Sequence, residues 1–214
     1  MQEIEFIKTI KEMELIVTSI LAFGGTNIDD IFLLVIFFAN KDYKTKHIVI
    51  GQYIGIIALI GISIIGSFIG LLFDHIYIGL LGLLPVYFGI RDLFGLNKGR
   101  KGEREGKLLS HRKRANKTFS VAAVTFSNGG DNLGVYIPLF VTLGMPQKIV
   151  MVIIFLIMVA IWCIAAKYLS KHSAIANVID RFGHIITPIV LILLGIYILY
   201  SNGVFRALGI SMPR

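Results

Sequence analysis

Two short acidic motifs interrupt apolar runs of the chain, and their residue types are suited to cation binding. Carboxylate and amide oxygens are the ligands that hard divalent cations prefer. An Asp at the centre of a membrane helix costs about 2.5–3.5 kcal/mol on insertion scales, and a bound cation or a proton reduces that cost. The candidate metal ligands are Asn27, Asp29 and Asp30 in the first motif and Asn128, Asp131 and Asn132 in the second, supported by the hydroxyl residues Thr26 and Ser127.

The two motifs share one pattern, which indicates an internal repeat. Aligning Asn27 with Asn128 places Asp30 on Asp131, so both motifs contain a hydroxyl residue, Asn, two further residues and Asp. Residues three apart on a helix share a face, so each Asn should lie beside its Asp. Glycine pairs at 24–25 and 129–130 weaken a helix. We therefore expect a local break at each motif, with free carbonyls lining a polar cavity.

Two alternative roles fit the same residue types. Buried polar groups can pair with one another and only hold helices together, as in a scaffold. Paired carboxylates can also serve as an acid–base pair in an intramembrane enzyme. The duplication, and three carboxylates without an intramembrane Lys or Arg, favour a cation site. No second motif suggests a substrate or cofactor, so we predict neither a bound cofactor nor an enzyme. The chain also lacks the nucleotide-binding pattern GxxxxGK[ST], so transport would draw its energy from an ion gradient.

The composition predicts that these motifs lie in membrane helices. Hydrophobic residues make up 56% of the 214 residues and charged residues only 16%, and the mean hydropathy is +0.79. A soluble domain carries about 25% charged residues. Apolar runs near the length of a membrane helix predict six spans, at residues 15–39, 48–73, 76–96, 118–144, 149–169 and 184–201. The predicted fold class is an all-α membrane protein.

Positive charge predicts the orientation of these spans. The net charge is +8, and its bulk lies in alternate connections: 40–47, the basic stretch 97–117 and 170–183. Because Lys and Arg gather in cytoplasmic loops, these three connections should be cytoplasmic and both termini outside. We interpret the charge as a topology signal rather than as a nucleic-acid surface. The sole cysteine, Cys163, excludes an internal disulfide and is expected to be a small apolar helix residue.

The repeat and the span count together predict an inverted architecture. The third and sixth spans share a weaker match at Gly89 and Gly195. Three spans per half is an odd number, so the second half enters the membrane in the opposite sense, as in many secondary transporters. The expected organisation is a three-helix repeat at 1–96, a basic linker at 97–117 and a second three-helix repeat at 118–214.

At residues 26–32 and 127–138 the chain resembles the cadmium resistance transporter (Cad) family of the lysine-exporter superfamily. The resemblance implies a bacterial plasma-membrane protein that exports divalent heavy-metal cations, Cd²⁺ first, from the cytoplasm. Proton exchange at the same carboxylates is the simplest coupling hypothesis. Cd²⁺ is soft and favours thiolate, so an oxygen-rich site would hold it with moderate affinity. Export of organic cations or basic amino acids is the alternative, and homo-oligomers remain open.

Overall fold

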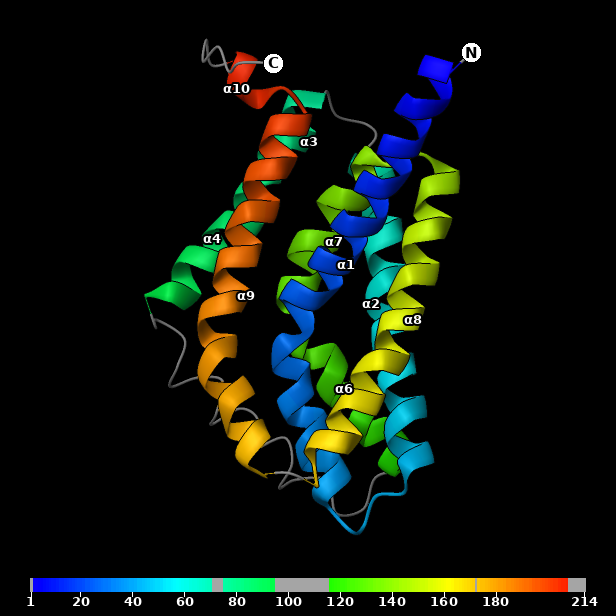
Figure 1. The fold of residues 1–214 in the computed structure, drawn as a ribbon, viewed down its shortest axis with the longest axis vertical. Coiled ribbons are helices and arrows are strands. Elements are labelled where there is room, and N and C mark those ends of the chain that lie inside the picture. The colour runs from blue at the N-terminus through cyan, green and yellow to red at the C-terminus, as the bar shows by residue number, and fades with distance from the viewer. Residues whose placement is uncertain (1, 71–74, 95–115, 172, 208–214) are drawn as a thin grey trace.

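The computed structural model describes residues 2–70, 75–94, 116–171 and 173–207, and every regular element in these ranges is a helix. Figure 1 shows the helices running roughly along one axis, as a bundle. In chain order they are α1 (Gln2–Ala39), α2 (Thr45–Gly70), α3 (His75–Leu80), α4 (Leu83–Leu93), α6 (Lys117–Asn128), α7 (Gly130–Thr142), α8 (Met145–Leu169), α9 (Ser173–Ser201) and α10 (Val204–Ala207).

Three helices within the described residues are long and apolar enough to cross a membrane. They are Glu5–Ala39, Thr45–Phe68 and Met145–Leu169, with mean hydropathies of 1.8, 2.4 and 3.2. A shorter apolar helical stretch, Thr187–Ser201, lies in α9. Many large apolar side chains of these helices, such as Ile57 and Ile153, face outward, as expected where lipid replaces water. The all-helical membrane class predicted from composition is confirmed in this form.

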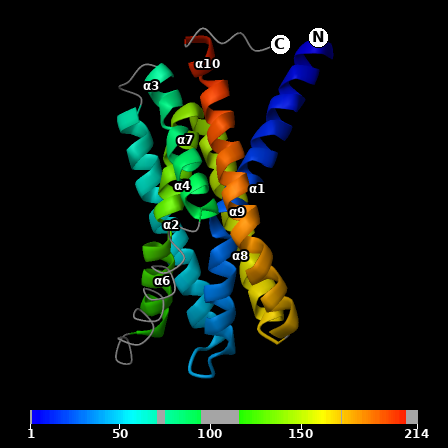
Figure 2. The ribbon, with the colours of Figure 1, turned by 90° about the vertical axis from the view of Figure 1, so that its left-hand side faces the viewer.

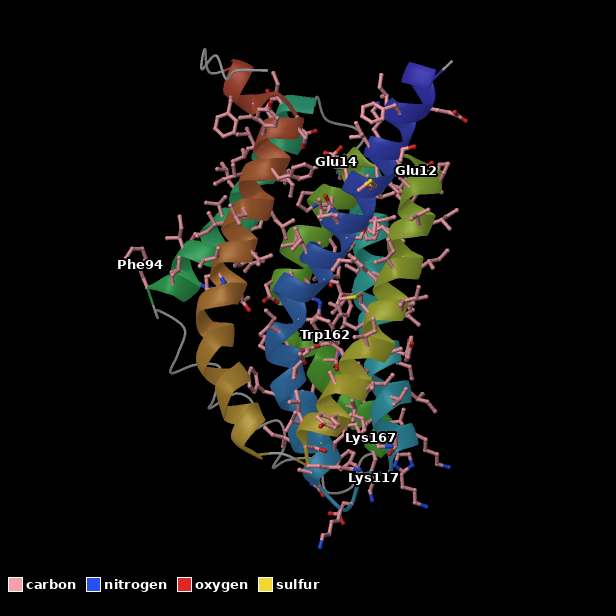
Figure 3. All side chains as sticks on the ribbon, viewed as in Figure 1. Glu12, Glu14, Phe94, Lys117, Trp162 and Lys167 are labelled. Carbon is pink, nitrogen blue, oxygen red and sulfur yellow. The ribbon has the colours of Figure 1, made fainter. Side chains whose placement is uncertain are left out.

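The helices pack so that elements from the two halves of the sequence are neighbours. α1 packs against α8 and α9, α2 packs against α6 and α7, and α4 packs against α9. The start of α1 and the short helix α10, which are the described segments nearest the two termini, lie at one end of the bundle (Figures 1 and 2). Lys117 and Lys167 lie at the opposite end, whereas Glu12 and Glu14 lie near the terminal end (Figure 3). The Nζ of Lys117 donates to the backbone oxygen of Asp42 at 2.5 Å, between the start of α6 and the α1–α2 connection.

Several predicted boundaries differ from the observed ones. α1 begins at Gln2 rather than at residue 15, because no Gly or Pro interrupts the helix there. The third predicted span corresponds to two helices, α3 and α4, joined by a turn in which Gly82 donates to the oxygen of Gly79. The basic linker lies outside the described residues except for Asn116 and Lys117.

The predicted break at the first glycine pair is wrong, because α1 is one continuous helix through Gly24 and Gly25. A Cβ built on Gly25 would overlap the side chain of Val190. This glycine therefore allows α9 to approach α1 closely and does not unwind the helix. Tertiary packing supplies the contacts that offset its low helix propensity.

Close glycine contacts also join α4 and α9, and they come in a reciprocal pair. A Cβ on Gly89 would lie 2.6 Å from the backbone oxygen of Pro188, and one on Gly195 would lie 2.5 Å from that of Gly82. Gly82 lies about two turns before Gly89, and Pro188 about two turns before Gly195. The segment from Gly82 to Gly89 and the segment from Pro188 to Gly195 thus present the same pair of positions to each other.

Candidate functional site

Asp30 is held by two side-chain amides that come from different helices. Its carboxylate is on α1 and is 4% exposed. The Nε2 of Gln52 on α2 donates to Oδ2 at 2.9 Å, and the Nδ2 of Asn128 on α6 donates to Oδ1 at 2.8 Å. Hydrogen bonds from neutral donors to a buried carboxylate stabilise its charged form. The structure thus places a buried, hydrogen-bonded acid where three helices meet.

Gln52 extends this arrangement to a fourth side chain. It is 1% exposed, and its Oε1 accepts a hydrogen bond from the Thr125 hydroxyl at 2.5 Å. Thr125 lies one turn before Asn128 on α6, so both residues reach the same place from one helix face. We call Asp30, Gln52, Thr125 and Asn128 the acidic cluster.

A second cluster, in which every member is neutral, is centred on the hydroxyl of Tyr136. The Nδ2 atoms of Asn27 and Asn132 donate to it at 2.8 and 3.0 Å, and the Thr26 hydroxyl lies 3.1 Å away. Asn132 also donates to Oδ1 of Asn27 at 3.0 Å. A phenol has two acceptor sites and one proton, so it can serve both amides and donate to Thr26. This amide cluster joins α1 to α7.

The two clusters adjoin along α1. Asn27 precedes Asp30 by three positions and both are buried, so they lie on one helix face. The backbone oxygen of Asn27 accepts a hydrogen bond from Nε1 of Trp162 on α8 at 2.7 Å. Trp162 packs edge-on against Phe23, with 5.5 Å between ring centroids. Aromatic side chains therefore bound the polar region on the α8 side.

The predicted break at the second glycine pair is confirmed. α6 ends at Asn128 and α7 begins at Gly130, with Gly129 between them at φ −78° and ψ 26°. A Cβ on Gly129 would overlap the side chain of Leu59 of α2, so a larger residue at this crossing would require Leu59 to shift. The break places the C-terminal end of α6, with its partial negative charge, beside the acidic cluster, which favours a cation there.

Asp131 lies in the first turn of α7 and is 7% exposed. Its Oδ1 accepts a hydrogen bond from its neighbour's backbone, the N–H of Asn132, at 3.1 Å. The partial positive charge at a helix N-terminus stabilises an ionised carboxylate. Asn132 donates a hydrogen bond to Asn27. Asp131 is next to Asn132 in sequence and Asp30 is three residues after Asn27, and both acids are buried.

The remaining predicted residues are less closely involved. Asp29 is half-buried on the neighbouring face of α1, and Ser127 is exposed, with its hydroxyl donating to the oxygen of Ala123 in its own helix. Within the described ranges, no three His, Cys, Asp or Glu side chains are grouped to hold a metal. Joint binding of one cation by Asp29, Asp30 and Asp131 therefore stays a prediction.

Sequence reasoning missed three residues of the two clusters. In the apolar run from Ile48 to Ile60, Gln52 and Tyr53 are the two polar residues. An amide side chain isolated in such a run could have indicated a buried functional residue. Thr125 and Tyr136 lie one turn from Asn128 and Asn132 respectively, so helical spacing from the motif indicates both.

Comparison with known proteins agrees with the motifs. A family model described as "Cadmium resistance transporter" matches residues 23–210, which include both motifs and both clusters. No curated protein matches the chain, and no solved structure matches it.

Proposed function

Since the chain belongs to the cadmium resistance transporter family, we propose that it exports a divalent heavy-metal cation, Cd²⁺ first, from a bacterial cytoplasm through the acidic cluster. The family is one of transporters and not an enzyme class. The observation that carries the proposal is Asp30, a carboxylate that is 4% exposed and held where α1, α2 and α6 meet. A buried acid in a membrane helix is costly, so it marks a passage for charge.

The depth of the acidic cluster supports this role. Asp30 lies about 14 Å along α1 from its end at Ala39, and Asn128 lies about 17 Å from the start of α6 at Lys117, at 1.5 Å per residue. Both helix ends belong to the lysine-bearing end of the bundle. A hydrocarbon core is about 30 Å thick, so these distances correspond to the middle of a bilayer. That is where secondary transporters bind their cargo.

The available ligands fit a cargo that must be released. Asp30 supplies a carboxylate, Asn128 supplies an amide and Thr125 supplies a hydroxyl. These are hard oxygen donors, whereas Cd²⁺ prefers thiolate. The site would therefore hold Cd²⁺ less tightly than a thiolate trap, and Asp131 would provide a second charge on the opposite side of the helix break. Proton binding at the same acids would displace the metal.

The packing supports two inverted three-helix repeats, with halves at 1–96 and 118–214. If the two halves are superposed, α1 corresponds to α6 and α7, and α2 corresponds to α8. The contact of α1 with α8 then corresponds to the contact of α6 and α7 with α2, and both contacts exist. It likewise turns the contact of Gly89 with Pro188 into that of Gly195 with Gly82. A two-fold exchange of this kind is the basis on which repeats rock against each other around a fixed site.

Replacing the acids tests the proposal. Asp30→Asn and Asp131→Asn remove the charge while keeping the side-chain shape. We expect each variant to abolish Cd²⁺ resistance in a sensitive bacterial host, with the protein still present in the membrane fraction. Asp42→Asn, in the exposed α1–α2 connection, is the matched control and should retain resistance. Full resistance in both Asp30→Asn and Asp131→Asn would refute the assignment.

Transport assays test cargo and coupling separately. Inside-out vesicles should accumulate Cd²⁺ when their interior is acidic, and an added protonophore should stop the accumulation. Uptake of tetramethylammonium without Cd²⁺ would instead support the alternative of organic-cation export. Cd²⁺ accumulation that persists at full rate with the protonophore would exclude proton exchange but not export.

A further inference from the structure

Gln52 occupies a position between an acid and a hydroxyl that neither motif includes. It lies on α2, is 1% exposed, and joins Asp30 on one side to Thr125 on the other. Its amide nitrogen faces the carboxylate and its amide oxygen faces the hydroxyl. Both ends of the amide are therefore engaged in hydrogen bonds.

The orientation of this amide suits an anion partner and not a cation. The Nε2 hydrogens of Gln52 point at Oδ2 of Asp30, where they partly balance its negative charge. A cation bound at Asp30 would meet these hydrogens with unfavourable electrostatics. A half-turn of the amide would replace them with Oε1, which is a hard ligand of the kind that divalent cations accept. No backbone movement is needed for that turn.

Thr125 allows the amide to adopt either orientation. Its hydroxyl donates to Oε1 of Gln52 in the structure, but a hydroxyl can also accept. After the half-turn, the Nε2 group would donate to the same Thr125 oxygen, so the amide nitrogen would keep a partner, while the cation would replace it at Oδ2 of Asp30. A buried group left unsatisfied would otherwise cost about 1–3 kcal/mol.

From this geometry we propose that Gln52 is a direct cation ligand, which binds through Oε1 after its amide turns and which Thr125 supports in both orientations. The inference rests on the proposed cation site at Asp30. It adds a ligand from α2 to those from α1 and α6. Cation occupancy would thus act directly on α2, the helix that packs against both α6 and α7.

Comparing Met and Leu at position 52 separates a ligand from a positioning residue. Neither side chain can donate a hydrogen bond to Asp30, and their sizes are similar. Only Met offers a donor atom, a thioether sulfur, which is soft and favours Cd²⁺ over Mn²⁺. The measurement is isothermal titration of the detergent-purified full chain with Cd²⁺ and with Mn²⁺.

We expect Gln52→Leu to weaken the binding of both cations at least tenfold. Gln52→Met should bind Cd²⁺ at least tenfold more tightly than Gln52→Leu, while the two bind Mn²⁺ equally weakly. Equal Cd²⁺ binding by the Met and Leu variants would overturn the proposal, because Gln52 would then only orient Asp30. Ser63→Ala, at a buried hydroxyl bonded within α2, is the control and should bind as the unaltered protein does.

A third variant and the unaltered protein keep the test decisive. If either apolar variant does not fold, Gln52→Glu provides the test: a ligand at this position should tighten Cd²⁺ binding at least tenfold, and unchanged or weaker binding overturns the inference. If the unaltered protein binds no divalent cation, the proposed function itself fails. If it binds Cd²⁺ and Asp30→Asn abolishes binding, but Met and Leu behave alike, only the role of Gln52 fails.

Discussion

The polar residues at the centre of the bundle divide by charge into two clusters with different roles. The acidic cluster contains the carboxylate of Asp30, which accepts hydrogen bonds from two neutral amides, and we propose that it attracts the cation. The amide cluster has every donor matched to an acceptor around Tyr136. Because this cluster is neutral and its donors are satisfied, we propose that its role is to hold α1 against α7.

Removing the central hydroxyl tests this division. Tyr136→Phe leaves Asn27 and Asn132 without a shared acceptor in a buried region. We expect the free energy of unfolding to fall by about 1–3 kcal/mol, measured by thermal unfolding in detergent, while Cd²⁺ affinity per folded molecule changes less than threefold. Tyr53→Phe, which loses one half-buried bond to the Leu156 oxygen, should destabilise less. A tenfold loss of Cd²⁺ affinity in Tyr136→Phe would place the amide cluster in the binding site.

At the scale of elements, the contrast between α1 and the pair α6–α7 comes from what packs beside each glycine. Gly25 faces Val190 within a continuous helix, and α9 packs along that helix. Gly129 faces Leu59 and is followed by Gly130, whose Cβ position meets open space. The second pair therefore ends one helix and starts another, and the break delivers Asn128 to Asp30.

The glycine contacts of α4 and α9 make a sharp prediction about helix packing. Gly195→Ala would bring a methyl group to 2.5 Å from the backbone oxygen of Gly82, and backbone cannot move aside as a flexible side chain can. We expect a loss of about 1–3 kcal/mol in unfolding free energy from overpacking, measured as a lower midpoint of thermal unfolding. Gly61→Ala is the control, because a Cβ there meets nothing within 4 Å and Ala favours a helix by about 0.8–1.0 kcal/mol.

At the scale of the whole molecule, the distribution of lysines agrees with the proposed orientation. Four lysines are exposed: Lys41, Lys44, Lys117 and Lys167. Of these, Lys117 and Lys167 are labelled in Figure 3 and lie at the end of the bundle opposite the start of α1. Lys148, which in sequence belongs to the connection before the fifth predicted span, is instead 4% exposed in the first turn of α8 and donates to Ser67 at 3.0 Å. The connection between α7 and α8 therefore exposes less positive charge than its sequence indicates.

The single cysteine provides a clean background in which to test this orientation. In a Cys163→Ala protein, cysteines placed singly at Lys41, Gly144 and Lys171 would each be exposed. With a membrane-impermeant maleimide on intact cells, we expect labelling at Gly144→Cys and none at Lys41→Cys or Lys171→Cys. All three should react after the cells are lysed. Labelling of Lys41→Cys in intact cells would mean that the termini are cytoplasmic.

The sequence by itself determined the membrane class, the two motifs and the inward placement of Asn27, Asp30, Asn128 and Asp131. These follow from local causes: an apolar run long enough to cross a bilayer must be helical, and a polar group within it must face protein and not lipid. The family was also recognisable from the motifs and agrees with the matching family model.

Only the tertiary structure decided which polar groups meet. Gln52 is far from both motifs in sequence, and its bond to Asp30 depends on how α2 crosses α1 and α6. The break at Gly129 but not at Gly25 depends likewise on neighbouring helices. Helical periodicity determines which face of a helix a residue occupies, but which helix covers that face is set by packing between segments distant in the chain.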